Sequence, residues 1–313
     1  MQRLSRKVFV SGSSYIISLP KEWVVANSIK PGDTVFCTVG KTSILIQPHT
    51  EVRRVSEAVI EDERDRDMLI RKIISHYLAG YTTIRVKADS RGREGVYRAV
   101  SMLIGAEILE DSGNSIWIEI FTDERRFRVE ELLEKMSNTV FAMIDDFGRA
   151  LVEFDRDLLD VVIQREQEID RLYFLILRLL KSAVRYPDVA DHLNIHPKEV
   201  LGLRITLKNV ERVGDHIHTM AINLKEYGKA IPELEETARV SGEIFRTAMN
   251  SFFKIDEELA REVFRMVRSY TPASVADHSS VEDALKVRRI QDGFERILGY
   301  SEDIAEIVLN LSV

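Results

Sequence analysis

Residues 207–223 read LKNVERVGDHIHTMAIN, and this stretch indicates the fold class of the larger part of the chain. Its apolar residues recur at three- and four-residue spacing, which places them on one face of a helix. The same spacing runs through Leu132, Met136 and Val140 and continues to the end of the chain. The sequence therefore predicts an all-helical region over residues 126–313.

This helical region contains an internal repeat. Interruptions at residues 186–197 and 271–280 leave three helices before about Gly228 and three after Pro232. An offset of 84 residues aligns Arg204 with Arg288, Glu211 with Glu295 and Arg212 with Arg296, and an offset of 101 aligns residues 154–155 with 255–256. We therefore expect two three-helix repeats, residues 126–230 and 231–313, packed around a pseudo-twofold axis. Coincidence between amphipathic helices is the alternative.

Two pairs of acidic residues stand at helical spacing in the first repeat. Glu166 and Asp170 are four residues apart, as are Glu211 and Asp215, so each pair shares a helix face. Two such helices packed face to face would bring four carboxylates together, an arrangement that binds hard or borderline metals in helical bundles. The alternative is that neighbouring arginines neutralise these acids in structural ion pairs. The candidates are Arg165, Arg171 and Arg212.

Two histidines, His216 and His218, follow the second acidic pair directly. On an ideal helix His216 points well away from Asp215. We therefore expect His216 on the surface or in a hydrogen bond between helices rather than at a metal.

The first 48 residues form a small, basic, β-rich segment. Short β-branched runs alternate with turn signals, and one helical turn follows Pro20. This segment has six basic residues and two acidic ones, whereas the whole chain carries a net charge of −7. A basic module on an acidic chain indicates nucleic-acid contact. The alternative is that the charges cluster by chance. A module of this size cannot bury a core alone, so we expect it to pair with a second copy.

Residues 51–125 are expected to form a small α/β domain. Residues 51–67 are charged and are interpreted as a linker entering a helix over 66–79. A strand over 81–86, a helix over 93–104 and strands over 108–110 and 116–120 follow. No catalytic constellation is visible in this domain, which leaves a structural spacer or a ligand sensor.

Several classes of protein are not supported by the sequence. No run of 18 apolar residues and no secretory signal is visible, so we expect neither a membrane span nor export. The single cysteine, Cys37, excludes an intramolecular disulfide and fits a reducing cytoplasm. There is no phosphate-binding glycine-rich loop of the nucleotide-binding type and no local nucleophile motif.

Residues 12–23, GSSYIISLPKEW, and residues 29–33, IKPGD, resemble the AbrB/SpoVT swapped-hairpin DNA-binding domain. This resemblance covers residues 1–50. It implies a homodimer whose hairpins interleave, and DNA contact by basic side chains. The residues expected to contact DNA are Arg3, Arg6, Lys7 and Lys21.

Residues 166–174, EQEIDRLYF, and residues 207–223 resemble PhoU, the phosphate-uptake regulator. The resemblance implies that Glu166, Asp170, Glu211 and Asp215 ligate a divalent or trivalent metal such as iron or zinc. The second repeat departs from this pattern. Gly299 stands at the position of Asp215, and Val267 and Thr271 replace Glu166 and Asp170. We therefore expect a metal centre in the first repeat and none in the second.

Together the two resemblances imply a multidomain α+β protein of the archaeal PhoU-related type. It would comprise a swapped-hairpin β domain, a small α/β middle domain and an all-α bundle of two three-helix repeats. The expected function is a phosphate-responsive, DNA-binding transcription regulator controlling phosphate uptake, with a phosphate transporter or sensor kinase as a partner. The alternative is a cytoplasmic adaptor that binds proteins only and inhibits such a transporter or kinase. A metalloenzyme is disfavoured, because no general base or substrate pocket is signalled.

Overall fold

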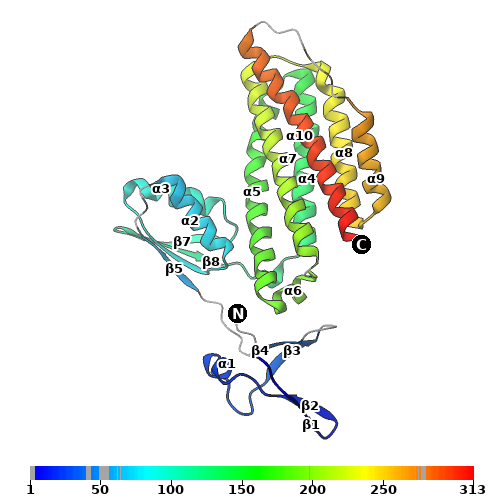
Figure 1. Cartoon of the computed structure of the whole chain (residues 1–313). Coiled ribbons are helices and arrows are strands. Elements are labelled where there is room, and N and C mark those ends of the chain that lie inside the picture. The colour runs from blue at the N-terminus through cyan, green and yellow to red at the C-terminus, as the bar shows by residue number, and fades with distance from the viewer. Residues whose placement is uncertain are drawn as a thin grey trace. The chain divides into compact units, whose positions relative to one another are not determined.

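The computed structural model describes residues 4–39, 44–48, 56–61, 63, 65–196, 198–271, 273, 275 and 280–313. The chain folds into two compact units, Met1–Arg54 and Val55–Val313 (Figure 1). The first is β-rich, and the second contains an α/β domain followed by a helical bundle. The predicted multidomain α+β class is confirmed, whereas the three domain boundaries proposed from the sequence remain predictions.

The described part of the N-terminal unit consists of two hairpins and a short helix. Strands β1 (Val8–Ser11) and β2 (Ser14–Ile17) pair antiparallel, and β3 (Val35–Val39) pairs with β4 (Ile44–Pro48). Helix α1 (Lys21–Ala26) lies between the hairpins in sequence. These elements agree with the β-branched runs and the single helical turn expected from the sequence. Gly40, Lys41 and Thr42, which stand between β3 and β4 in sequence, lie outside the described residues.

This N-terminal unit has no buried core among its described side chains. None of residues 4–39 and 44–48 whose side chains are described is buried. Val10, Tyr15 and Val39 expose 70, 79 and 74% of their surface. Exposed apolar area of this extent is unfavourable in water unless another surface covers it.

The α/β domain is a four-stranded sheet with two helices, as far as its described residues show. The strand order is β5 (Glu57–Ile60), β6 (Thr83–Lys87), β8 (Ser115–Ile120), β7 (Ala106–Ser112). Strand β5 runs parallel to β6, and the other two pairings are antiparallel. Helices α2 (Arg66–Leu78) and α3 (Ser90–Ser101) lie together on one face (Figure 1). Asp65 and Asp89 begin these helices by accepting hydrogen bonds from their first backbone N–H groups.

Strand β5 corrects the sequence-based interpretation of residues 51–67 as a linker. Ala58 and Ile60 are buried on the helix-covered side, while Glu57 and Val59 alternate outward. Four residues give only two periods of this alternation, and acidic neighbours mask it. The parallel pairing with β6 is non-local and leaves no further signal in the sequence.

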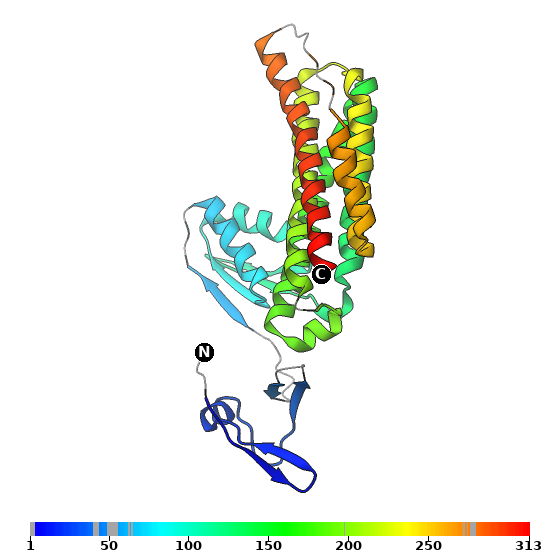
Figure 2. The same cartoon turned by 45° about the vertical axis from the view of Figure 1, so that its right-hand side comes forward.

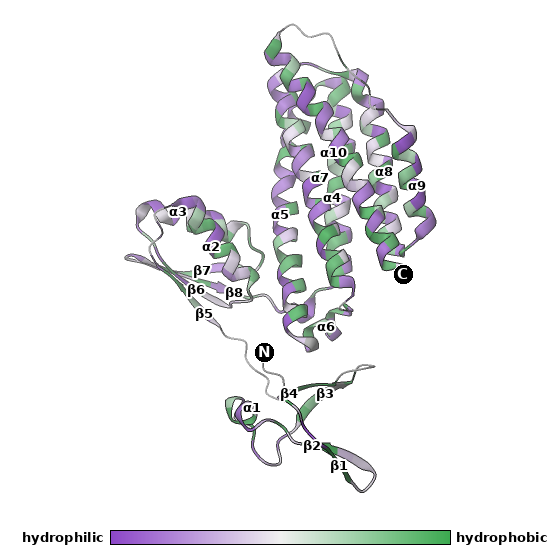
Figure 3. Ribbon diagram, in the orientation of Figure 1, coloured by the Kyte–Doolittle hydropathy of each residue, from purple (hydrophilic) through white to green (hydrophobic). Residues whose placement is uncertain are grey.

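In the part of the chain that the structure describes, seven helices form the bundle. The six long ones are α4 (Val129–Glu153), α5 (Arg156–Arg185), α7 (Glu199–Tyr227), α8 (Glu235–Lys254), α9 (Glu257–Ser269) and α10 (Val281–Leu311). Short α6 (Pro187–Leu193) falls inside the expected interruption at residues 186–197. Hydrophobic and hydrophilic residues alternate along each helix (Figure 3), as expected for helices that bury one face. No helix among the described residues is long and apolar enough to cross a membrane.

The internal repeat is visible in the backbone. Helix α4 ends at Phe154 with a left-handed conformation, φ 51°, and Asp155 caps the start of α5. Helix α8 ends in the same way at Ile255, φ 48°, and Asp256 caps α9. Two non-glycine residues with this rare conformation at aligned positions argue against coincidence.

Equivalent helices of the two repeats pack against each other. Helices α7 and α10 lie side by side in both views (Figures 1 and 2). Helices α4 and α8 meet through Phe141 and Phe245, whose ring centroids are 5.3 Å apart. These contacts agree with two repeats that pack against each other, and the pseudo-twofold axis stays a prediction.

A buried arginine joins the α/β domain to the bundle. Arg178 of α5 is only 3% exposed, and its Nη1 donates to the carbonyl oxygens of Tyr77 and Tyr81 at the end of α2. Its guanidinium also lies 4.9 Å from the Tyr77 ring centroid and 3.9 Å from a carboxylate oxygen of Glu124. A cation at the C-terminus of α2 satisfies carbonyl groups that the helix leaves unpaired.

Candidate metal centre

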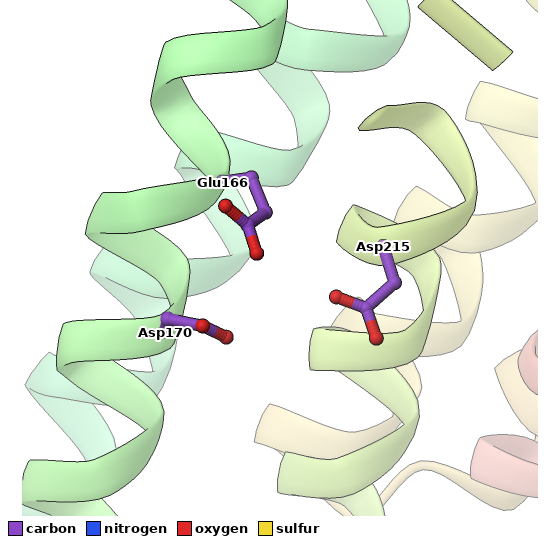
Figure 4. A group of neighbouring side chains, drawn as sticks. All are labelled: Glu166, Asp170 and Asp215. Carbon is purple, nitrogen blue, oxygen red and sulfur yellow. The ribbon is translucent and has the colours of Figure 1, made fainter. Parts of the chain in front are cut away.

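Three of the four predicted metal ligands lie together between α5 and α7. Glu166 and Asp170 project from α5 and Asp215 from α7, toward one another (Figure 4). One carboxylate oxygen from each lies within 4.8 Å of the others, and all three residues are half-buried. Oxygen atoms at such separations can converge on a single cation after small side-chain rotations.

A glycine allows the two helices to approach at this point. Gly214 of α7 lies against Ile169 of α5, and a Cβ built on Gly214 would be 2.7 Å from the Ile169 Cδ1 atom. Such a contact is too short for real atoms, so only glycine fits without a shift of a helix or side chain. Because Gly214 and Ile169 directly precede Asp215 and Asp170, this contact sets the distance between the carboxylates.

The fourth predicted ligand, Glu211, is buried and is engaged by a lysine. Glu211 is 7% exposed, and both of its carboxylate oxygens accept hydrogen bonds from Lys208 Nζ. Lys208 also lies 5.1 Å from the ring centroid of Tyr173 on α5. Sequence reasoning did not name Lys208, although its three-residue spacing from Glu211 was a signal for an ion pair.

Burial, together with the charges of the neighbouring carboxylates, raises the pKa values of two of these carboxyl groups. Burial, and then the charge of Glu166, raises the pKa of Asp170 to about 7. Burial, and then the charge of Glu211, raises the pKa of Asp215 to about 6. Neither side chain has a lysine or arginine partner at ion-pair distance among the described residues. A bound cation would relieve both the repulsion and the desolvation.

The arginines proposed as alternative partners do not neutralise the cluster. Arg165 pairs with Asp146 of α4 at 2.5 Å, and Arg212 lies over the ring of Tyr300. Arg171 makes no ion pair within the described residues. His216 also takes the expected place in a contact between helices, since its Nε2 lies 3.4 Å from the Tyr300 hydroxyl of α10.

The second repeat does not repeat this cluster in the described part of the chain. Glu295 of α10 is exposed and lies 3.8 Å from Arg288. Gly299 faces open space where the first repeat has Asp215. Val267 and Thr271 offer no carboxylate. These observations agree with a single metal centre per chain, which stays a prediction.

The predicted DNA-binding residues lie on the N-terminal unit. Arg6 and Lys7 precede β1, Lys21 begins α1, and all three are exposed. The Arg6 Nη1 donates to the carbonyl of Ser5 at 3.1 Å. Arg3 lies outside the described residues.

Comparison with protein families supports both resemblances seen in the sequence. Residues 133–224 match the PhoU domain, a range that begins in α4 and ends in α7. Residues 8–54 match the family described as antidote-toxin recognition MazE, bacterial antitoxin. The PhoU match therefore covers the repeat that carries the carboxylate cluster, and it ends before the repeat that lacks it.

Comparison with whole proteins adds one solved structure. The chain is similar to the crystal structure of PhoU from Pseudomonas aeruginosa, with a TM-score of 0.48 and 19% sequence identity. That match covers 59% of this chain and 95% of the other. No curated protein matches the chain.

Proposed function

We propose that this chain is a cytoplasmic, phosphate-responsive regulator that binds DNA through its N-terminal unit and a metal ion through its helical bundle. The observation that carries the proposal is the carboxylate cluster within a PhoU domain, on a chain that also has a MazE-type domain. We propose no enzymatic reaction. A phosphate transporter or a sensor kinase is the proposed protein partner.

The proposed metal ligands are Glu166, Asp170, Asp215 and, after release from Lys208, Glu211. An all-carboxylate donor set suits hard or borderline cations. Divalent iron, trivalent iron and zinc are cations of this class. The bound ion would supply positive charge that links α5 to α7. The chain's own contribution is to hold the carboxylates close together across the contact between Gly214 and Ile169.

The proposed DNA-binding form is a homodimer of N-terminal units. The exposed apolar side chains of both hairpins are the surface that pairing would cover. Arg6, Lys7 and Lys21, with Arg3, would then contribute from both copies and contact DNA phosphates. A dimer would present these basic side chains twice, which matters because a single chain offers few of them for DNA binding.

A gel shift with the DNA upstream of the protein's own gene tests the DNA-binding part of the proposal. We expect the full chain to bind with an affinity that falls steeply as salt rises, because phosphate contacts release counterions. The substitution Arg6→Gln/Lys7→Gln/Lys21→Gln is expected to abolish the shift. Lys181→Gln/Arg185→Gln/Lys198→Gln, on the bundle, is the matched control and should leave it unchanged.

The same experiment separates the proposal from the adaptor alternative. A protein that dimerises through its N-terminal unit but gives no shift at any salt concentration is an adaptor. Equal loss of the shift in both sets of variants would show non-specific charge effects and contradict a DNA surface on the N-terminal unit.

A further inference from the structure

A lysine already holds one of the four carboxylates expected at the metal centre. Glu211 stands four residues before Asp215 on α7, so the two side chains share a helix face. Among the described residues, however, Asp215 converges with Glu166 and Asp170 and not with Glu211. Both carboxylate oxygens of Glu211 accept hydrogen bonds from Lys208 Nζ instead. The ammonium of Lys208 is therefore a cation bound to the fourth predicted ligand.

The burial of Glu211 makes this ion pair important. The side chain of Glu211 is 9% exposed, whereas the other three acids are half-buried. A buried carboxylate without a partner is costly, so the metal-free chain needs a cation at this position. Lys208 is three residues away on the same helix, so the pair forms within one turn of α7. A metal ion must take Glu211 from a partner that is already in place.

The ring of Tyr173 lies beside the same ammonium. Tyr173 is on α5, three residues after Asp170, and is 7% exposed. Lys208 Nζ is 5.1 Å from the centroid of this ring, and the guanidinium carbon of Arg204 is 5.7 Å from it. The face of an aromatic ring attracts a cation, and the Lys208 side chain is 33% exposed to water. The ammonium can therefore leave Glu211 without being buried alone.

We propose that Lys208 is an internal competitor of the metal ion: its ammonium holds Glu211 in the metal-free chain and releases it when a metal binds. This inference rests on the proposed function for the metal ion and deepens it by naming the residue that regulates binding. Lys208 is not a ligand itself. It sets how tightly the site binds, because every binding event has to break its ion pair with Glu211.

The charge of the ammonium also favours one class of metal ion. A divalent or trivalent ion attracts a carboxylate more strongly than a single positive charge does at the same distance. A monovalent ion brings no more charge than the ammonium that it would displace. Lys208 therefore disfavours monovalent ions and leaves Glu211 to ions of the class proposed for the site.

Calorimetric titration of Zn²⁺ into the chelator-treated full chain tests the proposal. We expect saturable binding by the natural chain and binding at least about tenfold tighter by Lys208→Met, because no charged hydrogen bond has to be broken. Arg204→Met is the matched control. It removes an equal charge from the same ring, and Arg204 makes no ion pair within the described residues. Its affinity should stay within about threefold of the natural one, since distant charges at the surface are screened.

A double-mutant cycle shows whether Lys208 acts through Glu211. In a chain that carries Glu211→Gln, the ion pair is already lost, so adding Lys208→Met should change the Zn²⁺ affinity by less than about threefold. The expected effect of Lys208→Met alone is a gain of affinity, which a misfolded variant would not show.

Chemical labelling of lysines gives a second readout that does not depend on affinity. Lys208 should react slowly with acetic anhydride while Glu211 holds its ammonium, and several-fold faster once Zn²⁺ is bound. Lys181, an exposed lysine of α5, is the control and should react at the same rate with and without Zn²⁺. Mass spectrometry of the digested chain measures both rates.

The outcomes separate this inference from the proposed function. If neither the natural chain nor Lys208→Met takes up Zn²⁺, the metal centre and the role of Lys208 both fail. A natural chain that binds Zn²⁺ as tightly as Lys208→Met would overturn the role of Lys208 alone. Equal tightening in Arg204→Met, tightening that persists with Glu211→Gln, or an unchanged labelling rate of Lys208 would do the same.

Discussion

At the scale of single residues, the carboxyl groups of Asp170 and Asp215 determine how the metal-free protein responds to pH. Their folded-state pKa values, about 7 and about 6, lie above the ordinary aspartate value. The folded protein therefore holds protons that the unfolded chain releases. The stability that these groups contribute is complete below about pH 4 and is lost as the pH rises through 6 to 7.

The substitution Asp170→Asn should remove much of this pH dependence. We predict that the metal-free variant melts at about the same temperature as the natural chain at pH 4 and roughly 2–4 °C higher at pH 7.5. Calorimetric melting curves of both proteins over this range measure the difference. Glu168→Gln, on the exposed side of the same helix, is the control, and a difference that stays constant with pH would contradict the assigned repulsion.

At the scale of elements, the contact between α5 and α7 depends on one glycine. Gly214→Ala places a methyl group 2.7 Å from Ile169, so the helices or side chains must shift. We predict a loss of about 1–3 kcal/mol in the free energy of unfolding, as for overpacked cores, together with weaker metal binding. Urea unfolding measures the first and metal titration the second.

Gly299→Ala is the matched control for this prediction. Gly299 is also a mid-helix glycine, but its new methyl group would meet nothing within 4 Å. Alanine is a better helix former than glycine, so the free energy of unfolding of this variant should rise by roughly 0.5–1 kcal/mol. Similar changes in the two variants would show that helix propensity, and not the contact with Ile169, governs both.

The attachment of the α/β domain to α5 depends on Arg178. Arg178→Ala would leave Glu124 and the carbonyl groups at the end of α2 without a buried cation. We predict a loss of about 3 kcal/mol in the free energy of unfolding, because breaking a buried pair leaves uncompensated charge. We also predict faster proteolysis around residues 121–128. Lys181→Ala, exposed on the same helix, should change both measurements little, and equal effects of the two substitutions would contradict a special role for Arg178.

The elements show which features the sequence could predict. Helical periodicity sustained over many turns identified the long helices, and the aligned pairs Phe154-Asp155 and Ile255-Asp256 identified the repeat. Strand β5 was missed because its pattern is short. Lys208 as the partner of Glu211 was signalled by its three-residue spacing within α7. Arg178 as a domain contact depends on which elements meet, and local spacing does not determine that contact.

At the scale of the whole molecule, the exposed apolar surface of the N-terminal unit supports the proposed pairing with a second copy. Phe9 and Ile16 are cross-strand neighbours in the first hairpin and expose 58 and 48% of their surface. We predict that the full chain is a dimer at micromolar concentration and that Phe9→Glu/Ile16→Glu makes it a monomer, because pairing would have to bury charge. Light scattering after size exclusion measures the mass, with Val281→Glu on α10, 79% exposed, as the control. A monomeric natural chain would contradict the pairing.

We propose that carboxylates from α5 and α7 hold a metal ion inside the bundle. Elemental analysis of the purified protein measures this binding, with the natural chain beside a variant that carries Glu166→Gln, Asp170→Asn, Glu211→Gln and Asp215→Asn. We predict about one equivalent of a divalent or trivalent metal per natural chain and almost none in the variant. Equal metal content in the two proteins, or a natural chain that takes up none from a metal-containing buffer, would contradict the claim.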